Sequence, residues 1–201
     1  MSAARTFGFT LVELMIGLAI AGLLLMLALP SFSLWIADAQ IGNAAESIAS
    51  GLRYAQAEAI KQNSQVEFLV DPTAGTGGWT AQLIDGTTCK PVPPAAQVGT
   101  FRDGADKVNF ATFDVTGAAG GTRVTFTGLG DRLKNPAGAV KNCDGSEMLA
   151  EVRIPSPVGG TRSLNVLIFG GASGVAGQGS RSGIKICDPK WPATDPKGCP
   201  V

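Results

Sequence analysis

The chain of 201 residues contains no histidine, few aromatic residues and no net charge. Histidine is the side chain that most often serves as a general base or metal ligand, so its absence argues against many hydrolytic and metal-dependent sites. The 16 basic and 16 acidic residues balance, so no overall field attracts nucleic acid. Aromatic residues make up 6% of the chain whereas glycine occurs 27 times, which favours a loop-rich β domain over a helical one.

Patterns that support catalysis are also missing. The segment Gly170–Gly183 is rich in glycine, but no Lys-Ser or Lys-Thr pair follows it as in a phosphate-binding loop. Ser180 and Ser182 have no histidine to activate them, and the acidic residues form no repeated pair. We therefore expect no enzyme, no cofactor and no metal site, and we interpret the glycine-rich segment as turns.

A long apolar run lies near the N-terminus. From Phe9 to Leu29 there are 21 residues with only two polar side chains, Thr10 and Glu13. At about 1.5 Å per residue, a helix of this length crosses a hydrocarbon core of about 30 Å. A carboxylate in lipid is costly, so Glu13 needs a cationic partner. Cleavage after Gly8 would create one, because the new α-amino group on a neighbouring copy can pair with Glu13.

Gly8, the sequence Phe-Thr-Leu-Val-Glu at residues 9–13 and the apolar run resemble the class III leader and N-terminal helix of type IV pilins and type II secretion pseudopilins. The resemblance implies that prepilin peptidase cuts after Gly8 and N-methylates Phe9. It also implies that Glu13 neutralises the N-terminus of a neighbouring subunit during assembly. The alternatives are an ordinary single-pass anchor and a Sec signal peptide, whose apolar core precedes its cleavage site.

This interpretation divides the chain into four parts. They are a prepilin leader (1–8), a transmembrane or filament-core helix (9–30), an amphipathic helix (31–63) and a β-rich head with a disulfide-closed tail (64–201). Arg5 and the initiator amine keep the N-terminus in the cytoplasm by the positive-inside rule. We therefore expect a single-pass inner-membrane protein with a periplasmic head, which later becomes part of a periplasmic or extracellular filament.

The segment after Pro30 has the pattern of an amphipathic helix. Its apolar residues recur at steps of three, four and seven, which predicts a stripe that packs on the head. The stripe consists of Leu34, Ile41, Ala45, Ile48, Leu52, Ala55 and Ala59. Gln62-Asn63-Ser64 are expected to end the helix. The run 51–60 is similar to a stretch of the GspH/FimT branch of pseudopilins and minor pilins, and we interpret Arg53 and Glu58 within it as solvated charges.

The head is expected to contain antiparallel strands. Gln65–Val70 and Trp79–Ile84 predict a hairpin, and further strands are expected at Val108–Val115, Arg123–Phe126, Met148–Ile154 and Ser163–Phe169. Gly86–Gly99 and Lys134–Ser146 are expected to be loops, and Val124–Gly130 again resembles the GspH/FimT branch. The predicted fold class is α+β: a type IV pilin-like long N-terminal helix packed on a small antiparallel β-sheet head.

Four cysteines fit an oxidising compartment such as the periplasm. They allow three pairings, of which we favour Cys89–Cys143 and Cys187–Cys199. The second pair closes a proline-rich loop with little core of its own, where a cross-link matters most. A zinc site is the alternative, but the chain has neither a Cys-x-x-Cys pair nor a histidine.

The last quarter of the chain is basic. Residues 153–201 contain six basic and two acidic side chains, a net charge of +4. FimT-type minor pilins carry a Gly-Arg-x-Arg motif before a cysteine, and in some of them this motif contributes to DNA binding. Lys185 takes the place of the second arginine before Cys187, Gly183 stands at the first, and Arg181 lies two residues earlier.

The resemblance thus names Arg181, Lys185 and Lys190 as candidate DNA-binding residues. A few cations on a loop bind phosphate weakly and in a salt-dependent way. Repetition along a filament strengthens such binding. The alternative is that these cations are solvated loop charges.

The sequence therefore predicts a minor pilin that helps to initiate or cap a type IV pilus, with DNA uptake as a further role of the basic tail. The alternative function is that of a minor, GspH-like pseudopilin of the type II secretion system. The expected partners are other pilins in a filament, prepilin peptidase, the inner-membrane assembly platform, the membrane and, for the tail, DNA.

Overall fold

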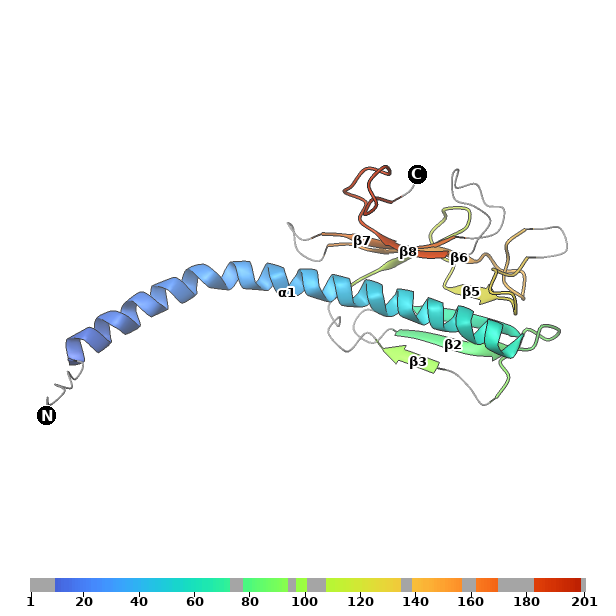
Figure 1. The fold of residues 1–201 in the computed structure, drawn as a ribbon, viewed down its shortest axis with the longest axis horizontal. Helices are drawn as coiled ribbons and strands as arrows, with labels where there is room; N and C mark the ends of the chain where they lie inside the picture. The colour runs from blue at the N-terminus through green and yellow to red at the C-terminus, as the bar shows by residue number, and fades with distance from the viewer. Residues whose placement is uncertain are drawn as a thin grey trace, which may run out of the picture. The chain divides into compact units, whose positions relative to one another are not determined.

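The structure, a computed structural model (Figure 1), divides into two compact units, Met1–Ile36 and Ala37–Val201. It describes residues 10–72, 78–93, 97–100, 108–134, 139–156, 162–169 and 183–199. At residues 27–31, 97–100 and 169 the description extends to the backbone only.

One helix, α1 (Leu11–Gln62), runs through both units and includes Pro30. Its C-terminal end is a Schellman motif, in which Asn63 adopts the left-handed conformation with φ of 47°. The Asn63 N–H donates to the Ile60 carbonyl at 3.2 Å, and the Ser64 N–H donates to the Ala59 carbonyl at 3.1 Å. These bonds satisfy carbonyl groups that would otherwise lack partners at the helix end. The helix ends where Gln62-Asn63-Ser64 predicted.

The first sheet has four antiparallel strands in the order β3-β2-β1-β5. They are β1 (Gln65–Asp71), β2 (Gly78–Ile84), β3 (Gln97–Thr100) and β5 (Arg123–Phe126). The predicted hairpin is confirmed, with Gln65 paired to Ile84 and Asp71 to Gly78. The expected loop at Gly86–Gly99 is partly wrong, because β3 begins within it and pairs with β2.

The second sheet is also antiparallel, in the order β4-β6-β7-β8. It consists of β4 (Ala111–Asp114), β6 (Leu149–Ile154), β7 (Leu164–Phe169) and β8 (Gly183–Cys187). The expected strand Val108–Val115 is thus shorter than predicted. The last strand, β8, was not predicted.

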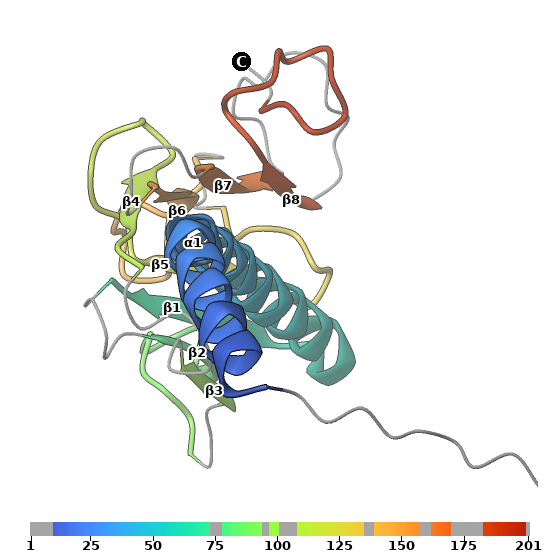
Figure 2. The same ribbon diagram turned by 90° about the vertical axis from the view of Figure 1, so that its left-hand side faces the viewer.

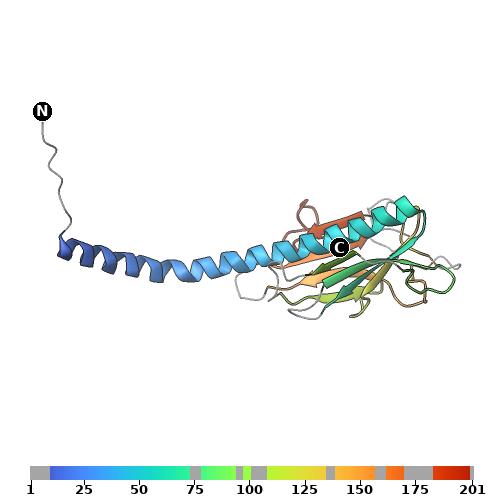
Figure 3. The same cartoon turned by 90° about the horizontal axis from the view of Figure 1, so that it is seen from below.

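The second half of α1 lies between the two sheets (Figure 2), with β6 to β8 on one side of it and β1 to β3 on the other. Figure 3 shows the same strands running alongside this part of the helix. Its buried stripe forms one core with both sheets. The stripe consists of Ile41, Ala44, Ala45, Ile48, Ala49, Leu52, Ala55 and Ala59.

This arrangement confirms the α+β fold with a helix packed on antiparallel strands. The predicted stripe holds from Ile41 to Ala59. Leu34, the first member of that predicted stripe, is 37% exposed and belongs to the first unit.

Candidate functional site

α1 begins with reciprocal hydrogen bonds between Thr10 and Glu13. The backbone N–H of Glu13 donates to Thr10 Oγ1 at 3.3 Å. The backbone N–H and the hydroxyl of Thr10 donate to Glu13 Oε2 at 3.1 and 3.0 Å. This is a capping box, which satisfies two N–H groups that the helix itself leaves without partners.

The Glu13 carboxylate keeps one oxygen available. Both bonds from Thr10 reach Oε2, and Oε1 has no partner among the described residues. Both side chains are exposed. A cation from another molecule can therefore bind Oε1 while the helix cap stays intact. Gly8 and Phe9, the predicted cleavage and methylation sites, lie outside the described residues.

The first unit exposes its apolar side chains. Eleven large apolar side chains between residues 11 and 26 are at least 55% exposed. They are Leu11, Val12, Leu14, Met15, Ile16, Leu18, Ile20, Leu23, Leu24, Leu25 and Met26. Phe32 and Trp35 stack on each other with ring centroids 5.8 Å apart. An apolar surface of this extent is expected to be covered by lipid or by another protein.

Among the helical residues that the structure describes, no stretch reaches the length and hydropathy that crossing a membrane requires. The predicted membrane segment 9–30 also includes Phe9 and the side chains of residues 27–30, which lie outside the description.

The structure pairs Cys89 with Cys143 and Cys187 with Cys199, which confirms the two pairs predicted from the sequence. The first bond connects the loop after β2 to the loop before β6. The second closes the tail after β8.

The candidate DNA-binding residues differ in their surroundings. Lys185 lies on β8, half-buried, and its Nζ donates to the Gly198 carbonyl at 2.8 Å. Its ammonium group therefore helps to hold the tail in place. Lys190 is exposed on the loop that the second disulfide closes. Arg181 lies outside the described residues.

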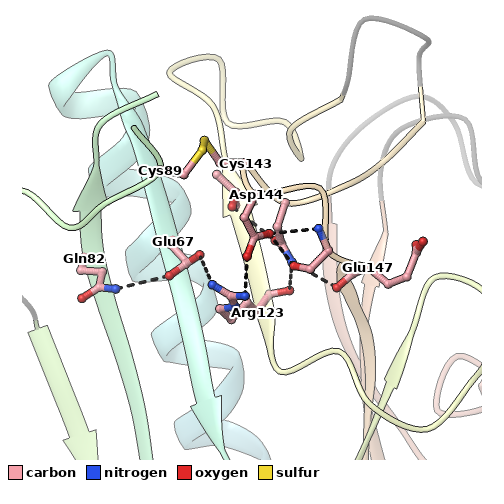
Figure 4. A network of polar contacts seen from close by, with 10 residues as sticks. Glu67, Gln82, Cys89, Arg123, Cys143, Asp144 and Glu147 are labelled. Carbon is pink, nitrogen blue, oxygen red and sulfur yellow. Dashed lines mark hydrogen bonds and ion pairs between the residues drawn. A yellow bond between two sulfur atoms is a disulfide. The ribbon is translucent and has the colours of Figure 1, made fainter. Parts of the chain in front are cut away.

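A polar network covers the face of the first sheet that points away from α1 (Figure 4). Glu67 alternates with the core residues Val66 and Phe68, so its side chain lies on the opposite face. Arg123 Nη1 is 3.6 Å from Glu67 Oε2, and Arg123 Nη2 donates to Asp144 Oδ2 at 2.6 Å. One guanidinium group thus connects β1 and β5 to the loop that precedes β6.

The loop itself is fixed by hydrogen bonds next to the Cys143 disulfide. Asp144 Oδ1 accepts the backbone N–H of Ser146 at 3.0 Å and its hydroxyl at 2.6 Å. Asn142, 4% exposed, donates from Nδ2 to Ser146 Oγ and to the Glu147 carbonyl, each at 3.1 Å. The Cys89–Cys143 disulfide and these hydrogen bonds therefore hold the loop against the first sheet.

The two carboxyl groups around Arg123 are shifted in opposite directions. Burial raises the pKa of Glu67, against the effect of the Arg123 charge. The hydrogen bonds from Ser146, together with Arg123, lower the pKa of Asp144. The network is best explained as structural support of the head, because its described members satisfy one another's hydrogen-bonding and charged groups.

Two features of these sites were not predicted from the sequence. Thr-x-x-Glu at residues 10–13 has the spacing of a capping box, and this signal was available in the sequence. The network around Arg123 has no local signal, because its residues come from β1, β5 and a distant loop.

Two protein families match separate segments of the chain. The family described as "Type II transport protein GspH" matches residues 44–168, from the second half of α1 into β7. The family described as "Prokaryotic N-terminal methylation motif" matches residues 4–29, which include the Thr10–Glu13 capping box.

One curated relative is the protein named "Fimbrial protein" from Dichelobacter nodosus. It is 37% identical over 86 residues, which are 40% of this chain and 53% of the relative. The chain therefore spans about half the length of this relative. No solved structure gives a significant match.

Proposed function

Because the chain belongs to the GspH family and carries the prokaryotic N-terminal methylation motif, we propose that it is a minor pilin that helps to initiate or cap a type IV pilus. The observation that carries this proposal is the methylation motif over residues 4–29, with Glu13 at the start of α1. The family consists of structural subunits rather than enzymes, and its members assemble with other pilins. The likeness to a fimbrial protein favours a pilus.

In this proposal the segment 9–30 anchors the new subunit in the inner membrane, with the head in the periplasm. Prepilin peptidase removes residues 1–8 and methylates the amine of Phe9. On assembly, the apolar side chains of the first unit exchange lipid for the helices of neighbouring subunits. The Phe9 amine of one subunit then binds Glu13 of another, which offsets the cost of a carboxylate in an apolar filament core.

Mass spectrometry of the N-terminus tests the processing step. We expect wild-type protein isolated from the native host to begin at N-methylated Phe9. Gly8→Val should leave the N-terminus at Met1, because a branched side chain does not fit where the peptidase accepts glycine, and Gly8→Ala should be processed poorly. Ala4→Val, a matched change inside the leader, should mature normally. A Gly8→Val product that begins at Phe9 would contradict the leader assignment.

A second candidate function follows from the description of the matching family, which names type II transport. In that case the subunit belongs to a short periplasmic filament of the type II secretion system. Deletion of the gene in the native host separates the two functions. Loss of surface pili with normal export of secreted enzymes favours the pilus, whereas the reverse result favours secretion.

We also propose DNA uptake as a role of the basic tail. Lys185 and Lys190 belong to β8 and the loop after it, and Arg181 precedes them in the chain. Changing Arg181 and Lys185 together to Ala should reduce DNA retention in a gel-shift assay at low salt, where phosphate contacts are strongest. Unchanged retention would remove these two residues from the proposal. Because Lys185 also bonds to Gly198, the Cys187–Cys199 disulfide of the variant must be verified.

A further inference from the structure

The tail after β8 contains the same turn twice. Asp188-Pro189-Lys190 and Asp195-Pro196-Lys197 repeat the sequence Asp-Pro-Lys. In the first turn Asp188 Oδ1 accepts the backbone N–H of Lys190 at 2.9 Å, and in the second Asp195 Oδ1 accepts that of Lys197 at 2.8 Å. Each carboxylate therefore accepts a hydrogen bond from the backbone of its own turn. Within the described part of the chain, neither lysine ammonium forms an ion pair.

Trp191 lies between these two turns with its side chain 46% exposed. The Lys197 Nζ lies over the Trp191 ring, 5.8 Å from the ring centroid, which is the geometry of a cation–π contact. Trp79 in the head, by contrast, is 9% exposed and belongs to the core. Trp191 therefore presents part of its aromatic ring at the surface of the tail, outside the core.

The loop that carries Trp191 is held rigidly. The Cys187–Cys199 disulfide closes it, and the Asp188 N–H donates to the Lys197 carbonyl at 2.8 Å. Lys185 Nζ donates to the Gly198 carbonyl at 2.8 Å. A Cβ atom at Gly198 would lie 2.0 Å from the Pro192 carbonyl oxygen, so these two parts of the loop backbone are in close contact. A rigid aromatic anchor loses little conformational entropy when it binds a partner.

We infer that the tail loop, residues 187–199, is a stacking platform for single-stranded nucleic acid. Trp191 stacks on an unpaired base, and Lys190 and Lys197 contact the phosphates on either side. An aromatic ring stacks on an unpaired base without regard to sequence, and nearby cations follow the backbone. Bases in a duplex already stack on each other, so an exposed ring gains little from them. This inference rests on the proposed DNA-binding role of the tail and specifies its ligand and its aromatic residue.

Fluorescence anisotropy of the full-length chain in detergent micelles tests the inference. The probes are fluorescein-labelled oligothymidylate of 20 nucleotides and a mixed-sequence duplex of 20 base pairs. Trp191→Leu should weaken binding of the single strand about tenfold and leave duplex binding within about twofold, because one stacked base contributes roughly this factor. Trp191→Phe should retain most of the affinity. Tyr54→Leu, a change of another exposed aromatic residue on α1, should have no effect.

A second set of variants tests the contribution of the two lysines. Lys190→Gln with Lys197→Gln should weaken binding of both probes and flatten its dependence on salt, because fewer counterions are released. Lys134→Gln, a matched exposed lysine outside the tail, should leave both affinities unchanged. Far-UV circular dichroism and a free-thiol assay verify that each variant is folded and disulfide-bonded.

Three results would overturn the inference, and they are distinguishable from failure of the proposed DNA role. If Trp191→Leu binds oligothymidylate as the wild type does while the lysine variant is weaker, DNA binding stands and stacking is overturned. If Trp191→Leu weakens single-strand and duplex binding equally, preference for the single strand is overturned. If dextran sulfate displaces oligothymidylate from wild type and Trp191→Leu at the same concentration, the tail recognises charge alone. Wild-type protein that binds neither probe overturns the DNA role itself.

Discussion

Glu67 and Asp144 share the Arg123 guanidinium but respond to it in different surroundings. Burial dominates at Glu67, whose side chain is 10% exposed, and raises its pKa. Hydrogen bonds from Ser146 dominate at Asp144, whose side chain is 39% exposed, and lower its pKa. The two groups therefore make opposite contributions to the dependence of stability on pH.

The sign of each contribution follows from linkage. Folding raises the pKa of Glu67, so the protonated form of this side chain stabilises the fold. The contribution is complete at pH values below the ordinary pKa of 4.5 and is lost as the pH rises through the raised pKa. A lowered pKa means that Asp144 stabilises the fold above its ordinary value of 3.8, and that this contribution is lost as pH falls through the lowered value.

Glu67→Gln keeps the shape of the side chain and its bond to Gln82 but removes the ionisation. We expect the free energy of unfolding of the variant, relative to wild type, to increase as pH rises above the ordinary pKa of 4.5, because only wild type loses the contribution of the buried protonated acid. Urea unfolding at a series of pH values measures this difference. Asp144→Asn should change in the opposite direction, with its deficit disappearing in acid. A Glu67→Gln difference that does not vary with pH would contradict the account.

At the scale of elements, the packing of α1 on the first sheet depends on small residues. A Cβ atom at Gly51 would lie 2.5 Å from the Trp79 ring and 2.9 Å from the Phe68 ring. Such a distance is well inside van der Waals contact, so the helix or the two rings would have to move. Alanines elsewhere in the buried stripe allow the same close approach.

Gly51→Ala should therefore destabilise the head by about 1–3 kcal/mol through overpacking, although alanine is favoured over glycine in helices by about 1 kcal/mol. Gly42→Ala is the matched control, because its Cβ would meet only the flexible end of Arg162 at 3.2 Å. That variant should be neutral or slightly stabilising. Urea denaturation of both proteins provides the comparison, and equal stability of the two would show that the contact with Trp79 is not tight.

At the scale of the whole molecule, the two units differ in how far their apolar side chains are buried. The second unit buries a continuous core of helix and strands, whereas the first exposes its apolar side chains along α1. An exposed apolar surface of this extent is expected to be covered by lipid or by another protein. Glu13 lies in the first turn of α1, where one carboxylate oxygen accepts the hydrogen bonds of the helix cap and the other has no partner among the described residues.

Glu13→Leu should lower incorporation into filaments about tenfold or more, because a neighbouring amine then has no carboxylate to bind. Thr10→Val separates assembly from capping: it removes the hydroxyl of the capping box but keeps the carboxylate, and it should assemble nearly as well as wild type. Immunoblots of sheared filaments, normalised to the membrane pool, measure incorporation. Normal assembly of Glu13→Leu would refute the proposed pairing, and equal defects in both variants would assign the effect to the helix cap.

The sequence by itself determined the features that depend on neighbouring residues in the chain. The buried stripe from Ile41 to Ala59, the helix end at Asn63 and the hairpin of β1 and β2 follow from periodicity and turn chemistry, which are local. The bounds of β5 were predicted correctly for the same reason. The similarity to pilins likewise rests on contiguous residues at the N-terminus.

Only the tertiary structure decided which short segments become strands and which charges meet. β3 and β8 have four and five residues, contain glycine and take their extended form from pairing with β2 and β7. Arg123 reaches Glu67 and Asp144 because strand order and a disulfide bring distant segments together. Such contacts depend on loop closure over many residues, for which a local pattern holds no information.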